Sequence, residues 1–413
     1  MAAKDENGTL VEIGPLSQDS GTSPDLDFPD GGFQGWMTVL GGFLVLFCTT
    51  GMSQSFGVFQ DYYTRISLNE ESASDISWIG SAQFGLFYCI GLPAGKLFDE
   101  GYFNHIMAFG SVLFTFSLFM VSITEPHHYY QVFLSQGLGM GIGTGFMLIP
   151  TLSVISHYFR RRRGLAQGIA ISGSSLGGVI WPIMLNHLIN SSVGFAWAVR
   201  AVAFITLVLL LVANLLMKTR LPSRKERVNY VAPSLRSILS DTPYILCIVG
   251  GWLVFWGMFF PFFYLQLFAV LHGVSTNLAF YSITILNTAS IFGRTIPNFL
   301  GDRWGNLNIM LLPTVVAACL ITVMLRTPTS GGVIVFAIMY GFFSGAFFSM
   351  INPALTSFAT SPNEVGIRIG IAAFFFGIAL LTGTPIGGAL LDPPHYIWSR
   401  AVAFNVVCRL KKD

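Results

Sequence analysis

The stretch WMTVLGGFLVLFCTTGMSQSFGVF, residues 36–59, carries no charged side chain over 24 consecutive positions. A helix needs about 20 mainly apolar residues to span the hydrocarbon core of a lipid bilayer. A core helix of a water-soluble domain rarely stays uncharged for that length, because one of its faces meets water. The stretch therefore predicts a membrane-spanning helix.

The same pattern recurs along the chain. Ten more apolar stretches of spanning length follow, at 77–98, 106–123, 131–155, 165–189, 196–217, 244–270, 279–300, 309–325, 333–358 and 366–391. A twelfth begins at 401 and stops at 407, before Arg409, Lys411 and Lys412, and is too short to cross. The predicted fold class is an all-α membrane protein of two six-helix halves, in which the twelfth helix is truncated.

The longest polar connection divides the chain. Residues 218–243 are polar and basic, and six predicted helices precede them while five and the stub follow. The expected organisation is a disordered cytosolic tail at 1–33, an N-terminal half at 34–217, a cytosolic linker at 218–243 and a C-terminal half at 244–413. Two such halves usually place a solute site between them at the middle of the bilayer.

Composition excludes several classes of function. Hydrophobic residues make up 53% of the chain and charged residues 10%, whereas a soluble domain carries roughly 25% charged residues. The net charge of +2 disfavours nucleic-acid binding. The five cysteines stand singly, without the spacing of a zinc site, and no nucleophile elbow is present. We therefore expect no metal, no cofactor and no enzyme activity.

The distribution of basic residues predicts the orientation. With the N-terminus inside, 14 Lys and Arg residues lie in cytoplasmic segments and 3 lie in outer loops, counted without Arg294 and the C-terminal tail. Basic loops stay in the cytosol. We expect a multi-pass protein of the plasma membrane with a cytosolic N-terminus, and Asn190, in an Asn-Ser-Ser sequon, to be glycosylated outside.

Two loops share a motif. GKLFDEG at 95–101 follows the second predicted helix, and NFLGDRWG at 298–305 follows the eighth. A carboxylate there can hold a neighbouring helix end in one conformer, although a solvated surface Asp is the alternative. The pattern resembles the paired loop signature of the major facilitator superfamily, with Glu100 where an Arg is usual. The resemblance implies conformational-switch roles for Gly95, Asp99, Asp302 and Arg303.

Two further stretches resemble the monocarboxylate porter family within that superfamily. PDGGFQGW at 29–36 is similar to its opening motif, and YFRRRRGLAQG at 158–168 to its helix-five signature. LTGTPIGGAL at 381–390 resembles the fungal branch. The residues that carry the first two matches are Asp30, Gly31, Gly32, Gly35, Trp36, Arg163, Leu165, Ala166 and Gly168. The resemblance implies a monomeric, alternating-access carrier of a small organic solute in the lipid bilayer.

The sequence departs from the family at its coupling residues. The helix-one Lys of the family falls on Gln54 and the helix-eight Asp on Ser290, whereas the Arg is kept as Arg294. A charge inside a span usually faces a pathway, so Arg294 is a candidate solute contact, with snorkelling to the cytoplasmic face as the alternative. Gln54, Asn287 and Gln266 are polar at similar depth and can bind a solute or bond between helices.

These observations predict a secondary active or facilitative transporter of a small organic solute, similar to monocarboxylate porters. Efflux of a fungal secondary metabolite is the alternative, because the loss of the helix-one Lys argues against lactate-like chemistry and the chain contains 38 Phe. A truncated paralogue that does not transport, or a receptor, is a second alternative.

Overall fold

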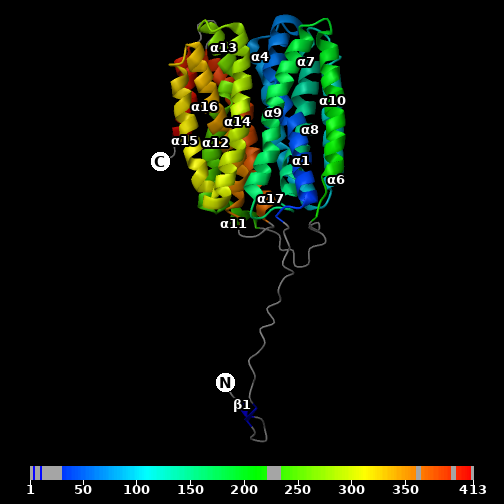
Figure 1. Cartoon of the computed structure of the whole chain (residues 1–413), viewed down its shortest axis with the longest axis vertical. Helices are drawn as coiled ribbons and strands as arrows, with labels where there is room; N and C mark the ends of the chain where they lie inside the picture. The colour runs from blue at the N-terminus through cyan, green and yellow to red at the C-terminus, as the bar shows by residue number, and fades with distance from the viewer. Residues whose placement is uncertain are drawn as a thin grey trace.

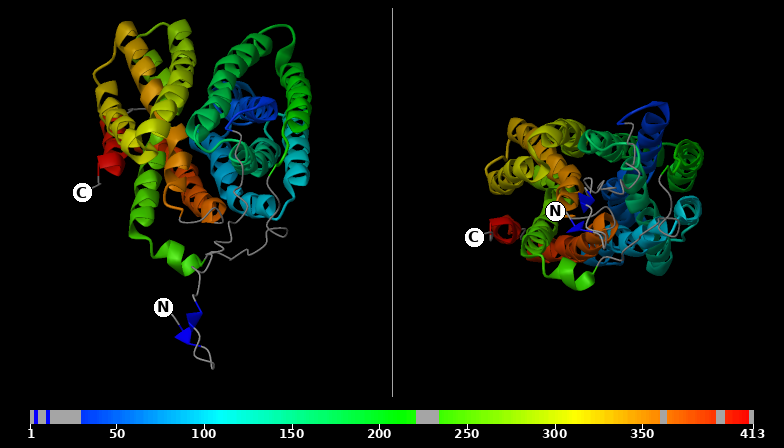
Figure 2. Two further views of the ribbon diagram at one scale, coloured as in Figure 1. Left: turned by 60° about the horizontal axis from the view of Figure 1, so that its bottom comes forward. Right: turned by 90° about the horizontal axis from the view of Figure 1, so that it is seen from below.

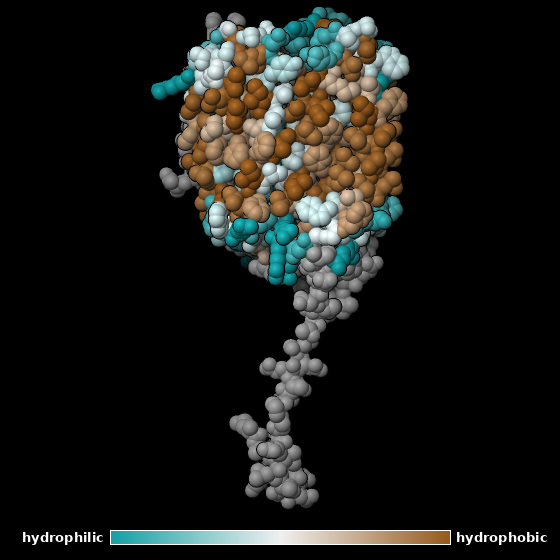
Figure 3. Space-filling view, in the orientation of Figure 1, coloured by the Kyte–Doolittle hydropathy of each residue, from teal (hydrophilic) through white to brown (hydrophobic). Residues whose placement is uncertain are grey.

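The structure is a computed structural model, and it describes residues 3–4, 10–11, 30–220, 234–359, 364–391 and 397–410. Most helices run along one common axis and form a bundle (Figure 1). Apolar residues form a broad band across the visible face of the bundle, between two hydrophilic ends (Figure 3). Most of the expected tail 1–33, the middle of the expected linker 218–243 and the residues after 410 lie outside the described residues.

The N-terminal half contains six predicted spans, several of them built from consecutive helical pieces. Its helices are α1 (Phe33–Cys48), α2 (Thr50–Ser53), α3 (Phe56–Tyr62), π-helix η1 (Tyr63–Ser67), α4 (Ala73–Cys89), α5 (Gly91–Asp99), α6 (Phe103–Val121), α7 (Tyr129–Val132), π-helix η2 (Phe133–Gly139), α8 (Met140–Ile155), α9 (Arg163–Ile189) and α10 (Gly194–Leu216). The first predicted span is thus interrupted near Thr49 and Gln54 rather than continuous.

The C-terminal half follows after residue 234. Its helices are α11 (Leu235–Leu239), α12 (Thr242–Met258), α13 (Phe260–Leu271), α14 (Thr276–Trp304), α15 (Asn306–Met324), α16 (Ser330–Thr356), α17 (Val365–Leu391) and α18 (Trp398–Leu410). Two strands of two residues each, β1 (Ala3–Lys4) and β2 (Leu10–Val11), pair antiparallel near the N-terminus, where the sequence predicts none.

Nine helical stretches of the described residues are long and apolar enough to cross a membrane. The pair α4 and α5, and the helix α14, are not among them. The reason is local composition, because α14 carries Asn287, Arg294 and Asn298 among its apolar residues, and all three are buried inside the bundle. Side chains that face the interior of a membrane bundle need not be apolar.

The two halves meet along two lines of contact, which we call the polar seam and the small-residue seam. Viewed from below in Figure 2, the N-terminal helices and the C-terminal helices form two groups side by side. The polar seam joins α9 to α14, and the small-residue seam joins α4 and α5 to α17. We call the end of the bundle that carries residues 160–163 and 303 the basic end, and the end that carries Asn190 the opposite end.

Candidate functional site

Arg294 crosses the polar seam in the interior of the bundle. Its side chain is 2% exposed, and its Nη1 donates to the carbonyl oxygen of Ile171 at 3.0 Å and to Ser174 Oγ, both on α9. Its Nε donates to Ser290 Oγ at 3.1 Å. Arg294 lies ten residues, about 15 Å, before the end of α14. In this conformation Arg294 therefore points across the seam to α9 and not along α14 to the basic end.

The guanidinium of Arg294 has no acidic partner among the described residues. The described carboxylates lie more than 4 Å from it, and the hydroxyl of Ser290, one turn earlier on α14, accepts from its Nε. The guanidinium carbon lies 4.8 Å from the centre of the Phe348 ring. Carbonyl and hydroxyl oxygens and an aromatic face therefore stabilise a positive charge between the halves.

Asp302 binds the start of α9 at the basic end. Its two carboxylate oxygens accept hydrogen bonds from the backbone N–H of Gly164 at 2.8 Å and of Leu165 at 2.9 Å. Backbone N–H groups in the first turn of a helix lack partners within the helix and favour a negative charge. The last turn of α14 in one half thus holds the start of a helix of the other half.

Asp99 occupies the corresponding place in the other seam. A Cβ built on Gly366, in the first turn of α17, would lie 2.8 Å from Asp99 Oδ2. Gly95 approaches Ile149, whose side chain lies 3.4 Å from a Cβ built there. Arg303 is exposed, and its guanidinium lies over the ring of Phe299 at 4.5 Å. Three of the four predicted switch residues thus lie at helix contacts, while Arg303 faces outward.

The two signature stretches contact each other at the basic end. Asp30 Oδ1 accepts from the backbone N–H of Arg160 at 2.7 Å and of Arg161 at 2.6 Å. The ring of Trp36 lies 5.2 Å from that of Phe159, edge to face, and Gly35 leaves room for the same ring. Gly32 has a φ of +80°, which a residue with a side chain rarely adopts.

The remaining signature residues belong to the first turns of α9. Gly168 lies directly against the backbone oxygen of Arg294, and Ala166 is buried. Leu165 donates to Asp302, while the Nε of Arg163 is buried without a hydrogen-bond partner in the described residues. The signatures therefore close the basic end, both within the N-terminal half and between the halves.

Gln54, Gly178 and Asn287 meet at the middle of the polar seam. Asn287 is 0% exposed, and its Nδ2 donates to the carbonyl oxygen of Gly178 at 3.3 Å. A Cβ built on Gly178 would lie 2.8 Å from Gln54 Oε1 and 2.9 Å from Asn287 Nδ2. Both amide oxygens, Gln54 Oε1 and Asn287 Oδ1, are buried and accept no hydrogen bond from the described residues.

A cavity lined mainly by aromatic rings adjoins Gln54. The lining residues are Ser53, Gln54, Phe56, Gly57, Phe84, Phe259, Phe262 and Phe263, which come from both halves. Its volume is about 10 Å³. A cavity needs about 10 to 15 Å³ to hold one water molecule, so the centre of the bundle is closed in this conformation.

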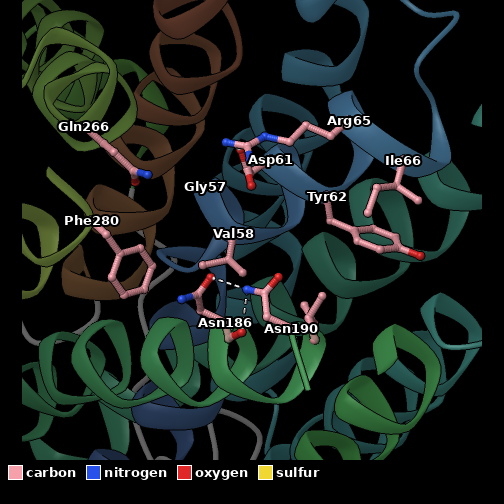
Figure 4. A pocket seen from close by; sticks show the side chains of 11 residues that line it. Gly57, Val58, Asp61, Tyr62, Arg65, Ile66, Asn186, Asn190, Gln266 and Phe280 are labelled. Atoms are coloured by element: carbon pink, nitrogen blue, oxygen red, sulfur yellow. Dashed lines mark hydrogen bonds and ion pairs between the residues drawn. The ribbon is translucent and has the colours of Figure 1, made fainter. Parts of the chain in front are cut away.

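A larger cavity of about 120 Å³ lies between the halves at the opposite end (Figure 4). It is lined by Gly57, Val58, Asp61, Tyr62, Arg65, Ile66, Asn186, Ile189, Asn190, Gln266 and Phe280. Gln266 thus lines this cavity, Gln54 lines the aromatic cavity, and Asn287 and Arg294 line neither. Asn190 Nδ2 donates to the Asn186 carbonyl oxygen at 2.8 Å at the same cavity.

Sequence reasoning did not identify the partners of Arg294 or the aromatic cavity. Ser174 and the carbonyl oxygen of Ile171 lie on α9, and their contact depends on how two helices are aligned. The glycines of α9 were a usable signal, since small residues let another helix approach closely. Among the described residues, no group of three His, Cys, Asp or Glu side chains is placed to hold a metal ion.

The comparisons with known proteins agree with this architecture. Residues 33–379 match the family model described as Major Facilitator Superfamily. The chain is 42% identical to the aspyridones efflux protein apdF of Emericella nidulans over 88% of this chain and 73% of that protein. It is 40% identical to the agnestins efflux protein AgnL12 of Paecilomyces divaricatus over 87% of this chain and 82% of that protein.

One solved structure has the same fold. The transporter FucP of the major facilitator superfamily, crystallised in the outward conformation, superposes with a TM-score of 0.64 over 90% of this chain and 95% of that one, at 16% identity. The family model covers most of the chain, and the bundle, its two halves and its apolar surface agree with it. This chain belongs to the major facilitator superfamily and is a multi-pass membrane transporter of that fold.

Proposed function

We propose that this protein exports an aromatic organic metabolite across the plasma membrane, with its N-terminus and the linker 218–243 in the cytosol. The observation that carries the proposal is the aromatic lining of the central cavity, contributed by both halves. A solute bound there would contact both halves at once, as alternating access requires.

Ring contacts between the halves support this solute class. The ring of Phe84, on α4, lies 5.0 Å from that of Phe259 and 5.9 Å from that of Phe263. Towards the basic end, Tyr88 lies 5.4 Å from Phe255. Aromatic rings stack favourably on one another, so a flat aromatic solute can replace these contacts when the halves separate. The two relatives described above are both named as efflux proteins.

The polar groups of the centre support a solute other than a simple monocarboxylate. Gln54 stands where the monocarboxylate porters have a Lys, so one cation of that pattern is missing. Arg294 is already bound to Ile171 and Ser174 in this conformation. A single buried cation suits a solute with one anionic or strongly polar group and a large apolar remainder. Metabolite efflux thus explains more of the site than monocarboxylate transport.

The conformation fits the last step of export. The basic end is closed by Asp302, Asp99 and Arg294, and the cavity between the halves lies at the opposite end. With the basic end in the cytosol, a solute would leave through the cavity at the opposite end. Gln54 and Ser290 also remove two groups that would titrate or pair during proton symport, so we expect facilitated diffusion or exchange.

Transport by purified protein in vesicles tests the proposal. The solutes are membrane-impermeant naphthalene and biphenyl sulfonates, whose fluorescence reports their movement, and lactate serves as the comparison solute. Protease cleavage within 218–243 from one side gives the orientation of each molecule. We expect flux of at least one aromatic solute and none of lactate. Flux of lactate alone would overturn the proposal.

Two variants locate the path. Phe84→Ala and Phe259→Ala each remove a ring from the central cavity, and each should reduce aromatic flux at least tenfold, since a stacked ring contributes about 1 kcal/mol and its removal also leaves a void. Phe109→Ala is the matched control, because this ring is 54% exposed on the outer surface of α6. Equal loss in all three variants would contradict a central site.

A further inference from the structure

We propose that Gln54 and Asn287 form an acceptor subsite that binds an O–H or N–H group of the exported solute. The inference deepens the proposed function and rests on it. It assigns to these two side chains a chemistry opposite to that of Arg294, which offers only donors.

The geometry leaves two oxygen atoms without donors at one place. The Nδ2 of Asn287 donates to the carbonyl oxygen of Gly178 at 3.3 Å. Because the two amide atoms point in different directions, the Oδ1 of Asn287 is directed away from α9. Gln54 Oε1 approaches the same glycine from α2, 2.8 Å from the position of a Cβ built there. Neither oxygen accepts a hydrogen bond from the described residues, and both are buried.

Such a pair is costly unless a ligand completes it. Buried amide oxygens nearly always accept a hydrogen bond, so each exception needs an explanation. Here the explanation is position, because Gln54 also lines the aromatic cavity between the halves, and Asn287 contacts the same glycine as Gln54 from α14 across the seam. A solute group that donates to one of these oxygens would bind where the two halves meet.

Gln167 has a buried amide oxygen of the same kind in a different setting. Gln167 Oε1 is buried and accepts no hydrogen bond in the described residues. Its Nε2 donates to the carbonyl oxygen of Leu152 at 3.0 Å, on α8, within the N-terminal half. Gln167 lines neither of the two cavities described above. It therefore serves as a matched control for a glutamine that has the same unsatisfied atom but no access to solute.

The consequence is a requirement on the solute. A phenolic hydroxyl or an amide N–H would donate to one of the two oxygens, whereas the corresponding methyl ether would leave both unpaired. Sites built to hydrogen-bond a solute group reject analogues that lack it. We expect about tenfold discrimination in kcat/KM, since one hydrogen bond of ordinary strength gives about that factor.

The experiment compares two impermeant solutes that differ by one methyl group. Hydroxynaphthalenesulfonate and methoxynaphthalenesulfonate are transported by purified full-length protein in vesicles, and kcat/KM is measured for each. Wild-type protein should prefer the hydroxyl compound about tenfold. Gln54→Met keeps the length of the side chain and removes the acceptor, so it should lower the preference to about twofold or less. Gln54→Glu retains acceptor oxygens and should keep it.

Further variants separate the subsite from general damage. Asn287→Leu should also reduce the preference, and Gly178→Ala should lower flux of both solutes because the added methyl group would meet both amides. Gln167→Met should leave the preference at the wild-type value. If Asn287→Leu does not fold, the comparison of Gln54→Met with Gln54→Glu is sufficient to test the subsite.

The outcomes distinguish the two proposals. Flux of neither solute, nor of any other aromatic sulfonate, overturns the proposed function and the subsite with it. Equal flux of the hydroxyl and methoxy compounds in wild type overturns the subsite alone, as does a preference that Gln54→Met leaves intact. Flux that requires Na⁺ but ignores the methyl group would mean that the oxygens bind a cation, which also overturns the subsite.

Discussion

The two seams between the halves use different chemistry for the same task. In the polar seam, α14 extends Arg294, Asn298 and Asp302 towards α9, which presents backbone and small residues such as Gly168. In the small-residue seam, Gly85 lies against the backbone of Gly377, and one of the hydrogen bonds across it joins Ser81 and Thr384 at 2.6 Å. Both seams include close contacts at glycines, but the buried guanidinium belongs to the polar seam.

This difference indicates how the halves can move. Small residues allow two helices to slide with little change in energy. A buried guanidinium must exchange its partners when the seam opens, and hydrogen bonds to charged groups contribute roughly 1.5 to 3 kcal/mol each. We therefore expect the polar seam to set the balance between conformers and the small-residue seam to act mainly as a pivot.

Of all substitutions in the two seams, removal of Arg294 should change the balance between conformers most. Arg294→Leu deletes two hydrogen bonds across the polar seam. The population of molecules that are open at the basic end should therefore rise tenfold or more, which corresponds to a free-energy change of roughly 1.4 kcal/mol or more. The melting temperature should not fall in parallel, because the substitution also removes a buried charge without an acidic partner.

Distances between two spin labels, measured by pulsed electron paramagnetic resonance, test this prediction. Spin labels at Arg162→Cys and Trp304→Cys, both exposed and on opposite sides of the polar seam, are placed in a protein whose five native cysteines are serine. A second, longer distance should become populated in Arg294→Leu. Arg294→Lys keeps the charge but has fewer donors. Its population of the longer distance should lie between those of the wild type and Arg294→Leu. An unchanged distance distribution would refute the locking role.

A pair of glycine substitutions compares the seams directly. A Cβ at Gly168 would overlap the backbone oxygen of Arg294, whereas a Cβ at Gly85 would lie 2.9 Å from Leu381 Cβ, a longer contact that a smaller backbone shift relieves. We expect Gly168→Ala to destabilise this conformer by about 2 kcal/mol and Gly85→Ala by about 1 kcal/mol. The same label pair and thermal unfolding provide the measurement. The reverse order would remove the distinction between the seams.

The apolar spans were predictable from the sequence, and the cross-seam contacts were not. Hydropathy identified α16 at 333–358, close to its observed bounds, because a span needs a minimum apolar length whatever it contacts. The contact of Arg294 with Ser174 depends on the alignment of two helices that are 120 residues apart in sequence. No local pattern contains that information.

The placement of Gln266 illustrates a second limit. The sequence groups it with Gln54 and Asn287 by depth, yet it lines the cavity at the opposite end. Gln266 lies on α13, after α12 ends at Met258 and a new helix begins at Phe260. A break of this kind changes the direction of the chain, so depth counted along one continuous helix is misleading beyond it.

Asp302 should have a moderate effect on the polar seam. Asp302→Ala removes the acceptor for Gly164 and Leu165, and loss of such a cap costs about 1 kcal/mol. The population open at the basic end should increase about fivefold. Asp302→Asn keeps one acceptor oxygen, so its free-energy change should be about half of that for Asp302→Ala. An alanine variant identical to wild type in the distance measurement would show that the carboxylate is only a surface group.

Ser81 should have a smaller effect, confined to stability. Ser81→Ala removes the hydrogen bond to Thr384, and we expect a loss of about 0.5 to 1 kcal/mol in unfolding free energy with no change in the balance of conformers. Thr384→Val should behave alike, and the double variant should cost little more than either single one. A shift in the label distances would mean that this seam also carries a lock.

The predicted sequon should affect stability least. Enzymatic removal of sugar should increase gel mobility of the wild type if Asn190 lies outside, and Ser192→Ala should abolish that change while keeping the Asn190 side chain. Stability should change by less than about 0.5 kcal/mol, because Asn190 is exposed. A wild-type protein without sugar would contradict the predicted glycosylation.

The lone charge of Arg294 also has an electrical consequence. A buried positive charge that has no carboxylate beside it among the described residues feels the membrane voltage whenever it shifts along the field, and a full crossing is worth about 2.3 kcal/mol per 100 mV. An anionic solute travelling beside Arg294 would cancel most of that charge, whereas a neutral solute would not. We therefore expect the turnover of neutral solutes to depend on membrane potential more steeply than that of anionic ones, which vesicles clamped with potassium and valinomycin can measure.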